Sequence, residues 1–298
     1  MKKTIAILFL LSLILGCQEK ENVITVFNKD GIAIKKSFFD INDKLVKTIK
    51  FYERNPEVEY KMVFKKDNYD SIVYKYDNGK VFKTGKKTLD SLLTGIWNLY
   101  DREGKLREIR EFFIVEGKSK LNRAWFLNKK GDTVAWNDDN NVFDQKEFVH
   151  DTLSIRHSSY NIFQFNKDTI YLNEPIRGVA YCFSPRIEDK YNSQIRVFLD
   201  TNDEKFTFDF SNDSIIRKQG YNNLEIDTIN QKWFDDISKE DFRYTAVFGS
   251  WFENPGKKLL QGYMEEYAIG PFQDIDADSI TSRIYFRKEI FVKDTLNK

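Results

Sequence analysis

The sequence predicts a mostly β protein, in which repeated β-hairpins form one sheet and are followed by an antiparallel β-sandwich. Aromatic residues make up 15% of the 298 residues, with 26 Phe and 15 Tyr, and such side chains pack well on a pleated surface. A turn motif recurs through the first half of the chain, whereas apolar and polar residues alternate beyond His150. Pro, which interrupts strands, occurs only 5 times.

The first element is a secretory leader. Lys2 and Lys3 precede an apolar stretch over Ile5–Leu15, which is shorter than the roughly 20 residues that a membrane span needs. The residues Ile14-Leu15-Gly16-Cys17 resemble the lipobox of bacterial lipoproteins. That resemblance implies removal of residues 1–16, lipidation of Cys17 and a polar tether over 17–22. The alternative is an ordinary signal peptide that happens to contain a cysteine.

The resemblance also implies a location. Acyl chains on Cys17 would hold the protein on a membrane of the cell envelope, because two or more chains anchor stably. Position 18 is Gln and not Asp, which by resemblance favours the outer membrane over the inner. The acidic stretch Gln18–Asn22 also resembles the surface-export signals of some lipoproteins, so surface exposure is a further expectation.

Residues 23–136 repeat one unit, which consists of an aromatic residue, a few polar residues, Gly and then a strand. A residue in the left-handed region closes many short hairpin loops, and Gly adopts that conformation without a steric clash. Each unit is therefore predicted to be one β-hairpin, with the turns at Gly31, Gly79, Gly104 and Gly131. In a degenerate copy beginning at Phe39, Asp43 stands where Gly would be.

The best unit, Gly95-Ile96-Trp97-Asn98-Leu99-Tyr100-Asp101-Arg102-Glu103-Gly104-Lys105-Leu106, resembles the MORN-repeat variant family. Tyr76 to Lys80 matches the same turn, and the copies at Phe27 and Phe39 match it poorly. The resemblance implies that residues 23–136 form an elongated single sheet.

Residues 137–149 read as a linker or long loop, and residues 150–298 as the sandwich, because many short strands alternate with turns. A helix is predicted over Lys232–Asp241. An Asp followed by Ser or Thr and an aliphatic residue is predicted to begin strands. The predicted strands are Thr152–Arg156, Asp168–Leu172, Ile176–Phe183, Gln194–Leu199, Lys205–Phe210, Phe242–Phe252, Lys258–Ala268 and Ser282–Val292.

Charge and cysteine content exclude some functions. Loss of Lys2 and Lys3 with the leader leaves 45 of the 47 basic residues against 46 acidic ones. A net charge near −1 gives no reason to expect nucleic-acid binding. Once Cys17 is acylated only Cys182 remains, so no intrachain disulfide forms, and an apolar run around Cys182 predicts a buried structural thiol.

No catalytic, metal or cofactor motif is complete. The Gly79–Lys87 segment has the wrong spacing for a phosphate loop, and the Gly249-Ser250 turn lacks the second Gly of a nucleophile elbow. The only histidines are His150 and His157, which are too few for a three-histidine zinc site. Asp274, Asp276 and Asp278 alternate like calcium ligands, but Gly and Glu are missing at the later positions. Glu265 and Glu266 are adjacent on a predicted strand and should face opposite sides.

Aromatic side chains are the remaining binding signal. Those expected on the repeat sheet are Trp97, Tyr100, Trp125 and Trp136. A single sheet cannot bury both faces, so these rings either meet a ligand or pack against the rest of the chain. We therefore expect a non-enzymatic envelope lipoprotein that acts as a protein-interaction or scaffold module. The alternatives are a glycan-binding surface lipoprotein and a hydrolase whose site is not recognised.

Overall fold

The structure is a computed structural model, and its description covers most of the chain beyond the leader. The residues described are 22–130, 135–137, 143–145, 148–149, 152–153, 158–187, 189–235 and 237–294. The predicted signal peptide, Cys17 and the tether up to residue 21 lie outside them, as do Gly131, His150 and His157. The predicted mostly β class is confirmed, because strands dominate the described residues.

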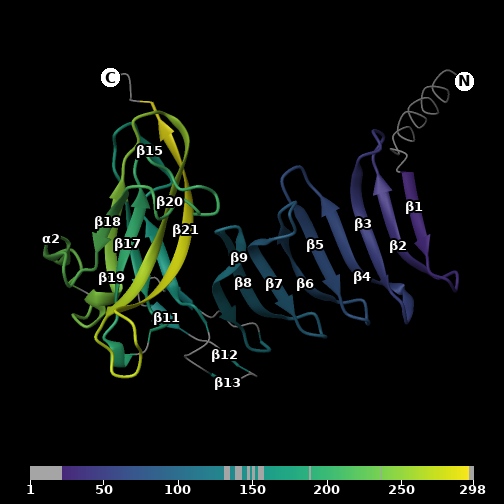
Figure 1. The fold of residues 1–298 in the computed structure, drawn as a ribbon, viewed down its shortest axis with the longest axis horizontal. Coiled ribbons are helices and arrows are strands. Elements are labelled where there is room, and N and C mark those ends of the chain that lie inside the picture. Colours follow the sequence, from purple (N-terminus) through teal and green to yellow (C-terminus); the bar gives the residue numbers. More distant parts are fainter. Residues whose placement is uncertain are drawn as a thin grey trace, which may run out of the picture. The chain divides into compact units, whose positions relative to one another are not determined.

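Strands β1 to β9 belong to a nine-stranded sheet in which they follow one another in sequence order (Figure 1). The chain divides into two compact units, the first of which holds residues up to Ser91 together with Leu99–Lys105. The strand bounds are β1 Asn22–Phe27, β2 Ala33–Phe39, β3 Leu45–Tyr52, β4 Asn55–Lys65, β5 Asp70–Lys75, β6 Val81–Lys87, β7 Leu93–Tyr100, β8 Leu106–Val115 and β9 Lys118–Phe126.

The predicted hairpin turns are confirmed wherever they are described. Gly31, Gly79 and Gly104 have φ values of 77°, 81° and 86°, and Asp43 occupies the same place with φ 58°. In each turn the residue three positions earlier accepts a hydrogen bond from this left-handed residue, for example Gly104 N to Asp101 O at 2.9 Å. The Asp101 carboxylate also accepts from the amides of Glu103 and Lys105, both at 2.9 Å. The turn chemistry thus follows directly from the repeated residues.

Side chains join neighbouring repeats in the first unit. The Tyr52 hydroxyl donates to the carbonyl of Lys75 at 2.6 Å, and the Tyr76 hydroxyl donates to the carbonyl of Tyr100 at 2.8 Å. These bonds link residues that are 23 and 24 positions apart. These two tyrosines therefore tie successive hairpins of the first unit together.

The second unit holds Leu92–Asn98 and residues from Leu106 onward, and it contains two larger sheets. One has the order β14-β16-β19, and the other has the order β15-β21-β20-β17-β18. Among the described residues of these two sheets, only the pairing of β15 with β21 is parallel. The bounds are β14 Asn161–Phe165, β15 Thr169–Tyr171, β16 Ile176–Cys182, β17 Gln194–Asp200, β18 Lys218–Asn222, β19 Thr245–Ser250, β20 Gly256–Ile269 and β21 Ser279–Lys293. The short strands β10 Ala135–Asn137 and β11 Phe143–Gln145 pair, as do β12 Phe148–Val149 and β13 Thr152–Leu153.

One hydrophobic core lies between these two sheets, as in a β-sandwich. Ile176, Ala180 and Phe248 of the three-stranded sheet belong to the same buried cluster as residues of the five-stranded sheet such as Val197 and Met264. Cys182 is part of this core at 5% exposure, and burial raises the pKa of its thiol. The predicted structural role of this cysteine is therefore confirmed.

Strands β8 and β9 are part of the second compact unit. Phe113 stacks on Tyr285 with the ring centroids 6.4 Å apart, and Arg123 on β9 donates to the carbonyl of Asn161 at 2.9 Å. These contacts connect the last hairpin of the repeat region to β14 and β21. Of the predicted linker 137–149, only Asn137, β11 and β12 fall within the described residues.

Two predicted elements of the second unit are wrong. Residues 205–210 form no strand, because Asn212 folds them into a turn by accepting from Thr207 N and donating to Lys205 O, both at 2.9 Å. The helix predicted over 232–241 is replaced, in the described residues, by the four-residue helix α2 at Thr228–Gln231 and the 3-10 turn η2 at Asp241–Tyr244. No described helix has the length and apolar character of a membrane span.

The Asp-Ser/Thr motif begins strands at β5, β15 and β21 but not everywhere. Asp227 caps helix α2 by accepting from the amide of Asn230 at 3.3 Å, and Asp213 lies in a turn. The motif supplies an acceptor at the start of an element, and this acceptor serves a helix as well as a strand. Strands β14 and β18 were not predicted.

Candidate functional site

The aromatic residues predicted to form a binding face are not gathered at one open surface. Trp97 is 3% exposed, so its ring is unavailable for stacking. Tyr100 is half-buried, and Trp125 packs against Leu127 and Tyr160 with the Arg123 guanidinium 5.1 Å from its ring. Trp136 lies on β10, a strand of which the structure describes only the backbone.

Two other tryptophans, which the sequence reasoning did not single out, are exposed. Trp233 follows helix α2 and is 72% exposed, and Trp251 follows strand β19 and is 54% exposed. Both line an open groove of about 800 Å³. Phe165 on β14, Gly178 on β16 and Phe248 on β19 also line it. A signal was present in the sequence, because Trp233 stands among Lys232, Asp235 and Asp236, where a buried ring is not expected.

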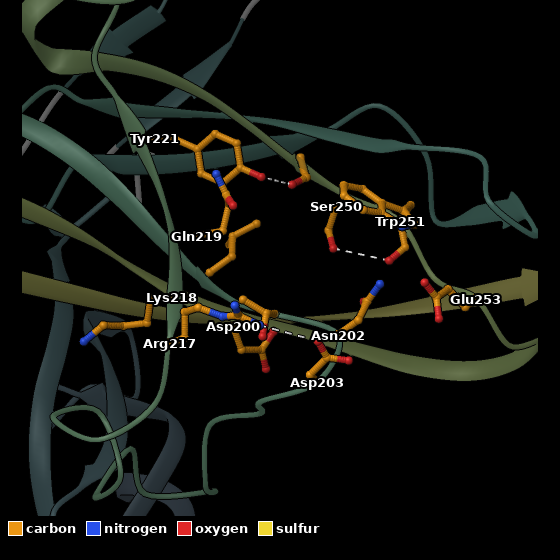
Figure 2. A pocket seen from close by; sticks show the side chains of 13 residues that line it. Asp200, Asn202, Asp203, Arg217, Lys218, Gln219, Tyr221, Ser250, Trp251 and Glu253 are labelled. Atoms are coloured by element: carbon orange, nitrogen blue, oxygen red, sulfur yellow. Dashed lines mark hydrogen bonds and ion pairs between the residues drawn. The ribbon is translucent and has the colours of Figure 1, made fainter.

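A second hollow of about 350 Å³ adjoins this groove and is shown in Figure 2. Both are lined by Tyr221, Gly249, Ser250 and Trp251, so they share one wall. We call the two hollows together the tryptophan groove. Strands β16 and β19 bound it on one side, and strands β17 and β18 bound it on the other. At 54% exposure, Trp251 leaves much of its ring open to a ligand where the two hollows meet.

Tyr221 fixes the floor of the tryptophan groove. Its hydroxyl donates to the carbonyl of Gly249, which ties β18 to β19 (Figure 2). Burial raises the pKa of this hydroxyl, so it stays protonated at neutral pH. Gly249 itself is required here, because a Cβ would lie 2.9 Å from the carbonyl oxygen of Ile176. The wall is thus held by the Tyr221 hydroxyl and by close backbone packing at Gly249, neither of which involves the ring of Trp251.

Polar groups line the smaller hollow. Asp203 and Arg217 form an exposed ion pair at 3.6 Å, and Asn202 and Glu253 are also exposed there. Figure 2 shows Asn202 and Asp203 on one side and Ser250 with Trp251 on the other. Carboxylates, an amide and a guanidinium provide both hydrogen-bond donors and acceptors. A polar ligand with a flat apolar face could form hydrogen bonds with these groups and stack on the Trp251 ring.

Asp200 is the buried acid at the base of this hollow. Its side chain is 3.4 Å from the Lys205 ammonium and accepts from the amide of Phe206 at 3.4 Å. Burial raises the pKa of this carboxyl above its ordinary 3.8, and the charge of Lys205 opposes that shift. The folded state therefore holds the proton more tightly than the unfolded state.

This shift predicts how stability changes with pH. An acid with a raised folded pKa contributes stability below its unfolded pKa of about 3.9, and that stability is lost as the pH rises through the folded pKa. Asp200→Asn stays neutral throughout, so we expect it to melt at a higher temperature than wild type near pH 7 and to lose this advantage near pH 4. Melting temperatures across this range test it, with Asp203→Asn as the exposed control. Parallel profiles for wild type and Asp200→Asn would contradict it.

The described residues contain no group of three or more His, Cys, Asp or Glu placed to hold a metal ion. The prediction that Glu265 and Glu266 face opposite sides is confirmed. Glu265 pairs with Arg196 and Arg283 at 2.6 and 2.7 Å, whereas Glu266 accepts from Ser193 Oγ at 2.8 Å. Both carboxylates are thereby committed to structure.

Comparisons with known proteins add little. No protein-family model matches the chain, and no curated protein sequence matches it. A solved structure of a mutant S. aureus TarM, in complex with fondaparinux, alpha-GlcNAc-glycerol and UDP, is similar with 19% sequence identity and a TM-score of 0.26. The similarity covers 46% of this chain and 23% of that one. At this TM-score the likeness carries no argument about fold or activity.

Proposed function

We propose that the protein is a non-enzymatic lipoprotein of the cell envelope that binds a glycan in the tryptophan groove. The observation that carries the proposal is the pair of exposed rings, Trp233 and Trp251, on a groove that carries polar side chains in its smaller hollow. The flat apolar faces of sugars stack on such rings, while their hydroxyls exchange hydrogen bonds with amide, carboxylate and guanidinium groups.

The envelope part of the proposal rests on the leader and on the lipobox-like residues that end at Cys17. Acyl chains on this cysteine would place the groove outside the cytoplasm, on the outer membrane in preference to the inner. Mass spectrometry of the N-terminal peptide from membrane-extracted protein tests this. An unmodified peptide that retains Met1 would refute the anchor.

Glycan-array binding by the Cys17→Ser protein tests the groove. We expect Trp233→Ala and Trp251→Ala each to weaken binding of the best glycan by about 2 kcal/mol, roughly thirtyfold, because an exposed ring that the bound sugar would cover is lost. Phe291→Ala removes a ring that is 51% exposed and does not line the groove, so it should bind as wild type does. Unchanged affinity in both tryptophan variants, with a normal melting temperature, would refute glycan binding at this groove.

A second candidate, protein interaction, is favoured by strand β1. Within the described residues β1 pairs only with β2, so its other edge is open. Its exposed apolar residues are Val23, Ile24, Val26 and Phe27. An open edge with apolar side chains can accept a strand from a partner. Crosslinking from β1 to an envelope protein, with no glycan bound on the array, would favour this candidate.

A further inference from the structure

A row of lysines crosses one face of the sheet in the first unit. Lys35 pairs with Lys50, Lys50 pairs with Lys61, Lys61 pairs with Tyr74 and Tyr74 pairs with Lys83. Residues directly opposite each other share one face of a sheet, and adjacent strands lie about 4.8 Å apart. We call Lys35, Lys50, Lys61, Tyr74 and Lys83 the lysine row.

The lysine row is unfavourable for the sheet by itself. Like charges that are directly opposite each other repel. In the described part of the chain, Lys35, Lys50 and Lys61 have no carboxylate within ion-pair distance, although other lysines of this sheet do, such as Lys65 with Asp70 at 2.6 Å. Lys61 and Lys83 instead lie 5.3 and 4.6 Å from the centre of the Tyr74 ring. The ring therefore holds two ammonium groups in line with the rest of the row.

The charge of the surrounding unit supports an anionic ligand. Residues 22–91 contain 15 basic and 10 acidic residues, a net charge of +5, whereas the whole chain has a formal net charge of only +1. Positive charge is therefore concentrated on the first unit. Such a field attracts anions and raises their local concentration.

We propose that the lysine row binds an acidic polysaccharide, laid across the strands with its carboxylates on the ammonium groups. Basic residues in a single line fit a linear polymer, whereas a membrane surface would need them spread over the whole face. An extended peptide repeats its same-side residues about every 6.6 Å, which does not match strands about 4.8 Å apart. This site is separate from the tryptophan groove.

Polygalacturonate binding by the Cys17→Ser protein tests the proposal, with Lys50→Glu as the diagnostic variant. The carboxylate would stand between Lys35 and Lys61 and so relieve their repulsion, so the variant should melt at a higher temperature than wild type. The same change should weaken polygalacturonate binding at least tenfold. Wild-type binding should also fall as salt rises, because the charges are partly exposed. If the Lys50→Glu protein is more stable than wild type and yet binds polygalacturonate more weakly, the loss of binding does not come from damage to the fold.

Lys47→Glu is the matched control, because Lys47 lies on β3 with Lys50 but pairs with Phe38 and Phe64 on the opposite face. It changes the net charge equally and should bind polygalacturonate as wild type does. Equal losses in the two variants, or no wild-type binding, would overturn the proposal. Binding to phosphatidylglycerol vesicles without binding to polygalacturonate would also overturn it. Loss of neutral-glycan binding in the Trp251→Ala protein with intact polygalacturonate binding would show that the two sites are independent.

Discussion

Gly262→Ala is expected to lower the free energy of unfolding by about 3 kcal/mol or more. A Cβ at this position of β20 would lie 2.3 Å from the carbonyl oxygen of Phe198 and 2.8 Å from Cδ2 of Leu199. The first contact is to backbone of the neighbouring strand β17, which pairs with β20 through Leu199 and Gly262. Relief of the clash therefore requires movement of a strand and not of a side chain.

Urea unfolding followed by tryptophan fluorescence measures this effect. Gly220→Ala is the matched control, because a Cβ there meets the Phe198 ring at 3.3 Å and meets no backbone within 4 Å. The ring can rotate, so the control should lose about 1 kcal/mol or less. Similar small losses in both variants would mean that β17 and β20 are not held as closely as the structure places them.

The local chemistry of the hairpin turns could be predicted from sequence. Asp43 shows this best, because the repeat places it where the left-handed Gly of the turn would be, and its observed φ is 58°. A hairpin turn is determined by a few consecutive residues, so its pattern is visible in a short window. The two long strands β20 and β21 were predicted equally well, because the predicted 258–268 and 282–292 lie within the observed bounds.

Elements that depend on distant contacts could not be predicted. Phe206 and Phe210 alternate like strand residues, but they are buried together against Tyr263 and Tyr285 at the end of a loop, and Phe208 between them is 60% exposed. The alternation was real, but it reflected packing onto another element and not a strand. The tryptophan groove was missed for the same reason, because Trp233 and Trp251 belong to different segments and line one groove only in the folded chain.

Asn122→Ala is expected to cost about 2–5 kcal/mol of unfolding free energy, because it leaves buried backbone groups without partners. Asn122 is 0% exposed on β9. Its amide nitrogen donates to the carbonyl of Tyr285 at 2.8 Å, and its amide oxygen accepts from the Tyr285 N–H at 2.8 Å. Strand β15 covers this edge of β21 only over residues 291–293, so Asn122 takes the place of a neighbouring strand at Tyr285.

Hydrogen exchange distinguishes this role from simple loss of packing. In Asn122→Ala the amide of Tyr285 should exchange faster relative to its neighbours in β21, because its acceptor is gone while the pairing with β20 continues on the other side. Asn202→Ala removes an exposed amide and should change stability by no more than about 0.5 kcal/mol. If the amide of Tyr285 exchanges at the wild-type rate in the Asn122→Ala protein, another group accepts its hydrogen bond. The Asn122 side chain would then not be what protects this edge of β21.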